Sequence, residues 1–174
     1  MSSKKIKTSA FVITSLALCA ALYTFKAPSS VAANKSGKVI GDWKITCEQN
    51  KNAKKEICFA QQSISITQDN KQVPLATYQF MYNDNNLKLI EILPQGILLQ
   101  PGTSIIAGDK ILANAKFTVC QNNTCVAVAD ISKNDLSTIL KFESVSLGMF
   151  NSDAKQANLA FSTKGLKEVL EEIK

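Results

Sequence analysis

The sequence contains no histidine and no arginine, so all 20 of its basic side chains are lysines. Without histidine the chain cannot build Ser-His-Asp or Cys-His catalytic sites, or the imidazole sites that hold most transition metals. Without arginine it lacks the side chain that bonds phosphate and base edges in a bidentate way. These absences argue against the common hydrolases, zinc enzymes and nucleic-acid-binding proteins. We therefore predict no catalytic, cofactor-binding or metal-binding residues.

Sequence motifs for other kinds of catalysis are missing as well. There is no G-x-S-x-G nucleophile elbow and no phosphate-binding glycine loop. The Asn-rich turn at residues 83–86 offers oxygen ligands but not the glycine and terminal glutamate of an EF-hand calcium loop. Carboxylate pairs can still support glycoside hydrolysis, but no two acids in the sequence form a convincing pair. We expect a protein that is not an enzyme, and we keep a carboxylate-dependent hydrolase of envelope polymers as the last alternative.

The first 33 residues have the order of a secretory signal peptide. Three lysines within residues 4–7 precede an apolar run over residues 8–25, and small residues at 31–33 allow cleavage before Asn34. The apolar run is long for a signal peptide, so an uncleaved membrane anchor is the alternative. Contact with a membrane is expected only through this segment.

Export changes both the charge and the expected state of the cysteines. Loss of residues 1–33 removes four lysines and no acid, which lowers the net charge from +6 to +2. No clustered basic face remains, so binding to nucleic acid is not expected. Disulfides persist in oxidising compartments, and four cysteines follow the signal, which allows three pairings. We favour a local pairing because each bond then closes a short loop, although the sequence alone does not decide it: Cys47–Cys58 and Cys120–Cys125.

The rest of the chain is typical of an all-β domain. A polar segment at residues 34–40 is predicted to be a flexible arm, and the folded domain is predicted over residues 41–174. From Trp43 onward, apolar and polar residues alternate in short segments separated by turn residues, which is the pattern of half-buried strands. Trp43 is the only tryptophan, and we interpret it as a core anchor rather than an exposed ligand platform. Many short strands without βαβ alternation indicate a sandwich or barrel.

The densest apolar run after the signal lies at residues 89–102. Pro94 and Pro101 cannot donate to a sheet ladder, and glycines follow each of them closely. We predict a strand, a turn, a short strand between Gly96 and Pro101 and a second turn, with isoleucine and leucine side chains in the core.

Two short helices are predicted near the C-terminus. Ser132 is followed three residues later by Asp135, a pattern that can start a helix. At the end of the chain, apolar residues recur at the spacing of one helix face: Leu166, Val169, Leu170 and Ile173. We expect this C-terminal helix to pack against the sheet, and contact with a partner's helix is the alternative.

Several short motifs in a fixed order resemble the invasion-associated locus B family of bacterial exported proteins. They are Trp43-x3-Cys47, Cys58, Leu93-Pro94-x-Gly96-Ile97-x-Leu99-x2-Gly102, Phe117-x2-Cys120-x4-Cys125 and Phe161-Ser162-x2-Gly165-Leu166. The resemblance covers about residues 40–173. Leu166 is the one departure, since the family pattern has phenylalanine there.

The resemblance implies an immunoglobulin-like β-sandwich with a short C-terminal helix and two local disulfides. It also implies a place in the periplasm or cell envelope of a Gram-negative bacterium, or on its surface, and a part in virulence through host-cell invasion. The expected partner is a protein of the host-cell surface or of the bacterial envelope. The alternative is a periplasmic structural or chaperone-like module that binds envelope proteins by strand addition at an open sheet edge.

Overall fold

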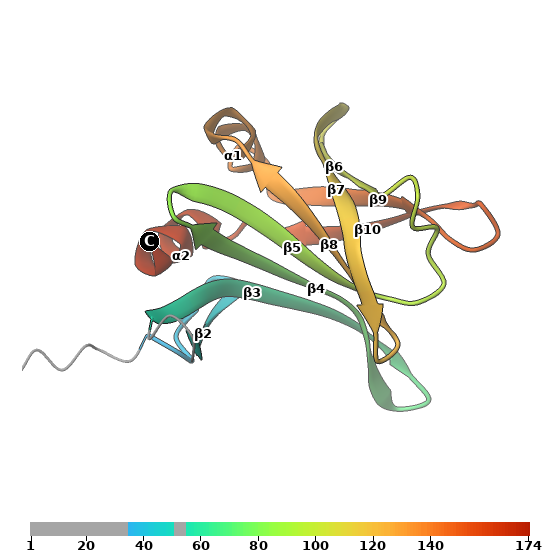
Figure 1. Ribbon diagram of the computed structural model, residues 1–174, viewed down its shortest axis with the longest axis horizontal. Helices are drawn as coiled ribbons and strands as arrows, with labels where there is room; N and C mark the ends of the chain where they lie inside the picture. The colour runs from blue at the N-terminus through green and yellow to red at the C-terminus, as the bar shows by residue number, and fades with distance from the viewer. Residues whose placement is uncertain (1–34, 51–54) are drawn as a thin grey trace, which may run out of the picture. The chain divides into compact units, whose positions relative to one another are not determined.

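A computed structural model of the protein describes residues 35–50 and 55–174 (Figure 1). The predicted signal peptide or anchor at residues 1–33 lies outside the described residues. No helix in the described ranges is long and apolar enough to cross a membrane.

Strands make up most of the described chain, and two short helices accompany them. In chain order the elements are β1 (Val39–Ile40), β2 (Trp43–Asn50), β3 (Lys55–Gln68), β4 (Lys71–Asn83), β5 (Asn86–Pro94), β6 (Thr103–Ala107), β7 (Lys110–Gln121), β8 (Thr124–Ile131), α1 (Lys133–Ile139), β9 (Ser144–Phe150), β10 (Gln156–Ser162) and α2 (Leu166–Ile173).

The strands form an antiparallel sheet that bends into two layers. Its order is β1-β2-β3-β4-β5-β8-β7-β6-β9-β10. The second half of β7, from Lys116, pairs with β8, whereas the first half, up to Ala115, pairs with β6. The register shifts between Phe117 and Val119, and such bulges bend a strand. β7 therefore belongs to both layers, and each layer contributes one face to a common core.

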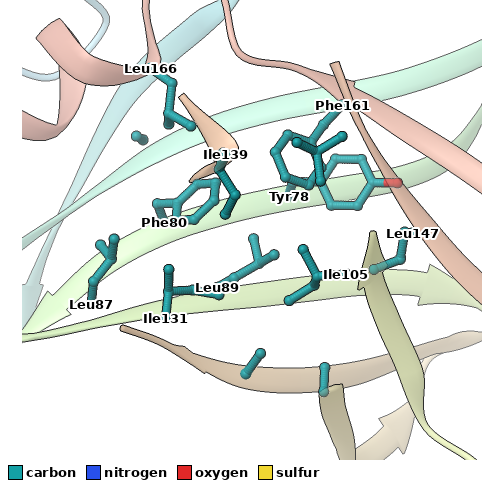
Figure 2. Close-up of a cluster of buried hydrophobic side chains, with 14 of the residues drawn as sticks. Tyr78, Phe80, Leu87, Leu89, Ile105, Ile131, Ile139, Leu147, Phe161 and Leu166 are labelled. Carbon is teal, nitrogen blue, oxygen red and sulfur yellow. The ribbon is translucent and has the colours of Figure 1, made fainter. Parts of the chain in front are cut away.

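Aromatic side chains from both layers meet in that core. The Phe161 ring on β10 lies 5.1 Å from Tyr78 and 5.9 Å from Phe80 on β4, measured between centroids (Figure 2). Trp43 on β2 is fully buried and contacts the rings of Phe80 and Phe161 at 5.4 and 6.0 Å. The all-β sandwich is confirmed, and so is the interpretation of Trp43 as a core anchor.

Both predicted helices are present. Ser132 caps α1, and its side chain accepts a bond from the Asp135 backbone N–H while Asp135 bonds back to the Ser132 N–H. This is the capping box that the sequence indicated. α2 packs on β2, β3 and β4. It buries Leu166, Val169 and Leu170, so the C-terminal helix packs against the sheet as expected.

The prediction of a flexible arm over residues 34–40 is wrong for its second half. Val39 and Ile40 form β1 and pair with Lys44 and Trp43 of β2. Just before them, the Gly37 N–H donates to the Ile45 carbonyl oxygen over 2.7 Å. The polar composition of this segment gave no indication of a strand, because these bonds join backbone groups and do not depend on side-chain type.

The short strand predicted between Gly96 and Pro101 does not form either. Ile97 makes one isolated bridge to Asn151, and Leu99 is 46% exposed. The chain between Pro94 and Pro101 leaves β5 in one layer and reaches β6 in the other. It is therefore a crossing loop, in which apolar residues do not have to form a strand.

Candidate functional site

Each disulfide joins two residues that face each other across one hairpin. Cys47 on β2 is bonded to Cys58 on β3, and Cys120 on β7 to Cys125 on β8. The structure thus contains the local pairing that the sequence favoured. Within residues 35–50 and 55–174, three possible metal ligands also come together at Cys47, Glu56 and Cys58. Both sulfurs belong to the disulfide, so they are not thiolate ligands and the cluster is not a metal site.

The two layers are joined by side chains where β2 begins alongside β3. β2 pairs with β3 only as far as Gln61, so Gln62 is the first residue beyond it. The Gln62 amide donates to the carbonyl oxygens of Asp42 and Ser162 at 3.2 and 3.4 Å and accepts from the Ser162 N–H at 2.8 Å. Trp43 Nε1 also donates to the Ser162 carbonyl oxygen over 3.0 Å. We call this set of contacts the Gln62–Ser162 junction.

Two glycines allow the backbones to approach closely beside this junction. Gly41 and Gly165 have φ values of 58° and 80°, and a Cβ on either would overlap a carbonyl group of the facing chain. The carbonyls are those of Lys164 and Ile40 respectively. Here the Asp42 N–H also donates to the Lys164 carbonyl oxygen over 3.0 Å. The contact explains why glycine stands directly before α2.

Beyond the junction, both strands have an open edge. Within the described residues, the β3 segment 62–68 pairs only with β4, and the β10 segment 156–160 pairs only with β9. In Figure 1 both segments extend away from α2, toward the turns of the β3–β4 and β9–β10 hairpins. Unpaired edges of this kind are the surfaces at which another strand can add.

Sequence reasoning missed a buried polar cluster between the layers. Glu91 on β5 is fully buried, and its Oε2 atom accepts a bond of 2.5 Å from the hydroxyl of Thr103 on β6. Tyr78 lies directly opposite Glu91 on β4. Among the described side chains, Glu91 Oε1 and the Tyr78 hydroxyl are buried without a hydrogen-bond partner. The alternation of Leu89, Glu91 and Leu93 is the signal that could have placed this acid on the core face.

Burial changes the titration of both groups. Burial raises the pKa of Glu91 to about 7, against a smaller lowering by the Thr103 hydrogen bond. Burial raises the pKa of Tyr78 as well, and the nearby Glu91 charge adds to that effect. Both groups are therefore uncharged in mildly acidic solution.

Two surface depressions do not contain a catalytic pair. One, of about 700 Å³, lies between residues 140–144 and 162–164 and has Glu143 as its acidic side chain. The other, of about 900 Å³, lies by the β4–β5 turn and α1 and has Asp130 as its acidic side chain. Because each has one acidic side chain, neither provides the two carboxylates of glycoside hydrolysis.

Comparison with known proteins gives a family and a fold. The model of the family "Invasion associated locus B (IalB) protein" matches residues 43–174. The crystal structure of invasion associated protein B from Bartonella henselae is similar, with a TM-score of 0.67 and 16% identity, over 78% of this chain and 92% of that one. A search of curated proteins found no match. Since the family model covers both layers of the sandwich and both disulfides, the chain belongs to the invasion associated locus B family.

Proposed function

We propose that the protein is a non-enzymatic exported protein of the bacterial envelope that supports host-cell invasion or binding. The observation on which this rests is the family match over residues 43–174, in a family named for association with invasion. The two disulfides agree with an oxidising compartment outside the cytoplasm. The predicted signal segment at residues 1–33 agrees with export.

Several observations support a binding rather than a catalytic role. The four described cysteines are in disulfides and so are not nucleophiles. The acid with a strongly raised pKa, Glu91, is sealed in the core with no exposed surface. A group that cannot touch a substrate cannot act on it as general acid or base.

The proposal can be tested by deleting the gene and measuring entry into host cells. We expect the deletion strain to grow normally but to attach to or enter fewer host cells, and plasmid-borne wild-type chain to restore both. Protease treatment of intact bacteria then distinguishes direct from indirect action. Digestion of the chain while a periplasmic marker stays intact would place it at the surface, where host contact can occur. Normal entry by the deletion strain would remove the invasion role.

A second candidate is a periplasmic module that binds envelope proteins by strand addition, favoured by the open edge of β10. The Ser162 N–H and C=O point away from β9, toward the Gln62–Ser162 junction. Because strand residues alternate, the main-chain groups of Ala160 and Asn158 point to the same open side. A strand added at this edge would bond to those groups.

Proline at residue 160 removes one outward N–H and leaves the bonds to β9 intact. We expect envelope proteins cross-linked by the wild type and by Ala160→Ser to be lost in Ala160→Pro. Equal capture by all three chains, or no capture at all, would count against strand addition. Thermal denaturation checks that both variants are folded.

A further inference from the structure

Glu91 is a carboxyl group placed where two layers of the sandwich close on each other. It lies on β5 in the first layer, and its hydrogen-bond partner Thr103 lies on β6 in the second. Both side chains are buried, with exposed fractions of 0% and 1%. The contact therefore crosses the core and exists only when the layers are closed.

Among the described residues, no lysine is buried in the core with Glu91. The opposing residues are Tyr78 on β4 and Ala127 on β8. From the other strands that line the core come Thr103, Ala115, Leu147, Met149 and Phe161. Lys88, three residues from Glu91, forms an ion pair with Asp130, and Lys116 on β7 is exposed.

Elementary electrostatics makes the ionised form of Glu91 costly in this position. A carboxylate that leaves water without a cation partner loses its hydration, so the group stays protonated or the site admits water. The Thr103 hydroxyl donates to one oxygen and favours the charged form, but the other oxygen has no described partner. Burial outweighs the single hydrogen bond, which agrees with a pKa raised to about 7.

We propose that Glu91 makes closure of the two layers depend on protonation. With the carboxyl neutral, the β5 and β6 side of the core is closed and dry. When the carboxyl ionises, this side opens to water so that the charge is hydrated. Thr103 sets the pH of the change, because its bond to Glu91 joins the two layers and is lost when they open. The device is independent of the role proposed above, and it responds to pH between mildly acidic and neutral surroundings.

The direction of the pH dependence follows from linkage. An acid whose pKa is higher in the folded state stabilises the fold at pH values below its unfolded-state pKa, near 4.5. This stabilisation is lost as the pH rises through its folded-state pKa, about 7. The test is urea unfolding of the full chain and of Glu91→Gln between pH 4 and 8. The two pKa values predict that the unfolding constant of the wild type rises about 200-fold relative to that of Glu91→Gln over this range. Parallel profiles for the two chains would overturn the proposal.

Two further measurements separate this device from an ordinary buried acid. Thr103→Val removes the hydroxyl and keeps the shape. Because the lost bond stabilises the closed form, the midpoint of the pH-dependent loss of stability should move downward, whereas in an ordinary buried acid it would move upward. In the wild type, amides of β5 and β6 should lose exchange protection above pH 7, after correction for intrinsic rates, but keep it in Glu91→Gln. If Glu91→Gln does not fold, the pH titration of the Glu91 carboxyl is followed in the wild type by its carbon-13 chemical shift, and the midpoint of that titration tests the proposal. A midpoint near 4.5, a midpoint that Thr103→Val leaves unmoved or raises, or unchanged protection each overturns the proposal.

Discussion

Gln62 is a polar side chain in the place where a neighbouring strand would otherwise lie. Its amide satisfies the N–H and C=O of Ser162 and the C=O of Asp42 at a point that β2 does not reach. Partly buried main-chain groups left without partners cost free energy, so this side chain contributes to the contact between the layers. The junction thus depends on a residue type that composition and periodicity treat as surface.

Replacing Gln62 by leucine should destabilise the domain by about 1–3 kcal/mol, because it leaves the partly buried Ser162 N–H without its acceptor. The matched control is Gln61→Leu, one residue earlier and on the outer face, where the amide bonds only to Gln79. We expect the control to change stability by no more than about 0.5 kcal/mol. Urea unfolding of both variants measures the difference, and equal losses would show that the junction bonds contribute little.

Gly165 combines a positive φ with a close backbone contact. In Gly165→Ala, the left-handed conformation costs about 1–2 kcal/mol, and overlap of the new Cβ with the Ile40 carbonyl adds to it. Gly96→Ala is the control, because Gly96 also has a positive φ but open space around the added atom. We expect Gly165→Ala to lower the melting temperature clearly more than Gly96→Ala. Similar shifts would contradict the close contact between residues 40 and 165.

At the scale of elements, the two cross-linked hairpins differ in the length of chain that each bond closes. The sequence separation is 11 residues for Cys47–Cys58 and 5 for Cys120–Cys125. A longer closed loop restricts the unfolded chain more, so the first bond should stabilise the fold more than the second. The comparison is informative because both bonds connect directly opposed residues of adjacent strands.

Replacing Cys47 and Cys58 together by serine should cost about 3 kcal/mol, and replacing Cys120 and Cys125 about 2 kcal/mol. The double replacements avoid unpaired thiols that could form wrong disulfides. Urea unfolding of the two variants and the wild type under non-reducing conditions gives both values. A larger loss for the shorter loop would mean that native-state contacts, rather than loop closure, dominate.

Local pattern predicted most elements but not the contacts between layers. Alternation located most of the strands, and the Ser132–Asp135 spacing located α1, because both depend on neighbours within a few residues. The crossing loop between Pro94 and Pro101 was predicted as a strand because a short run of apolar residues gives the same sequence pattern in a loop as in a strand. β1 was missed because backbone pairing over two residues leaves no side-chain signal.

The contacts of the candidate site were harder to predict from the sequence than the secondary-structure elements. Glu91 and Thr103 are 12 residues apart in the chain, and Gln62 and Ser162 are 100 apart. The sequence contains no rule that brings such pairs together, since their meeting depends on how the sheet bends at β7. The one indication that an acid faces the core is that Glu91 alternates with Leu89 and Leu93 along the same face of the strand. The disulfide residues were found because cysteine in an exported chain has a narrow range of uses.

At the scale of the whole molecule, the two layers are too interlocked to unfold separately. β7 belongs to both, and Phe161 of the second layer contacts the rings of Trp43 and Phe80 in the first. Loss of either layer would expose the inner face of the other to water. Small domains with one shared core generally unfold in one cooperative step.

We therefore expect Trp43 fluorescence and far-ultraviolet circular dichroism to give the same urea midpoint at a fixed pH. Trp43 reports on the layer contact, because it is fully buried against Phe161, whereas circular dichroism reports on strands throughout the sheet. Phe161→Ala should lower stability by about 3–5 kcal/mol and shift both signals together. Phe150→Ala, at a ring that is 41% exposed, is the control and should shift neither by much. If the fluorescence change came first, the layers would separate before the strands melt, and the sandwich would be two coupled units instead of one.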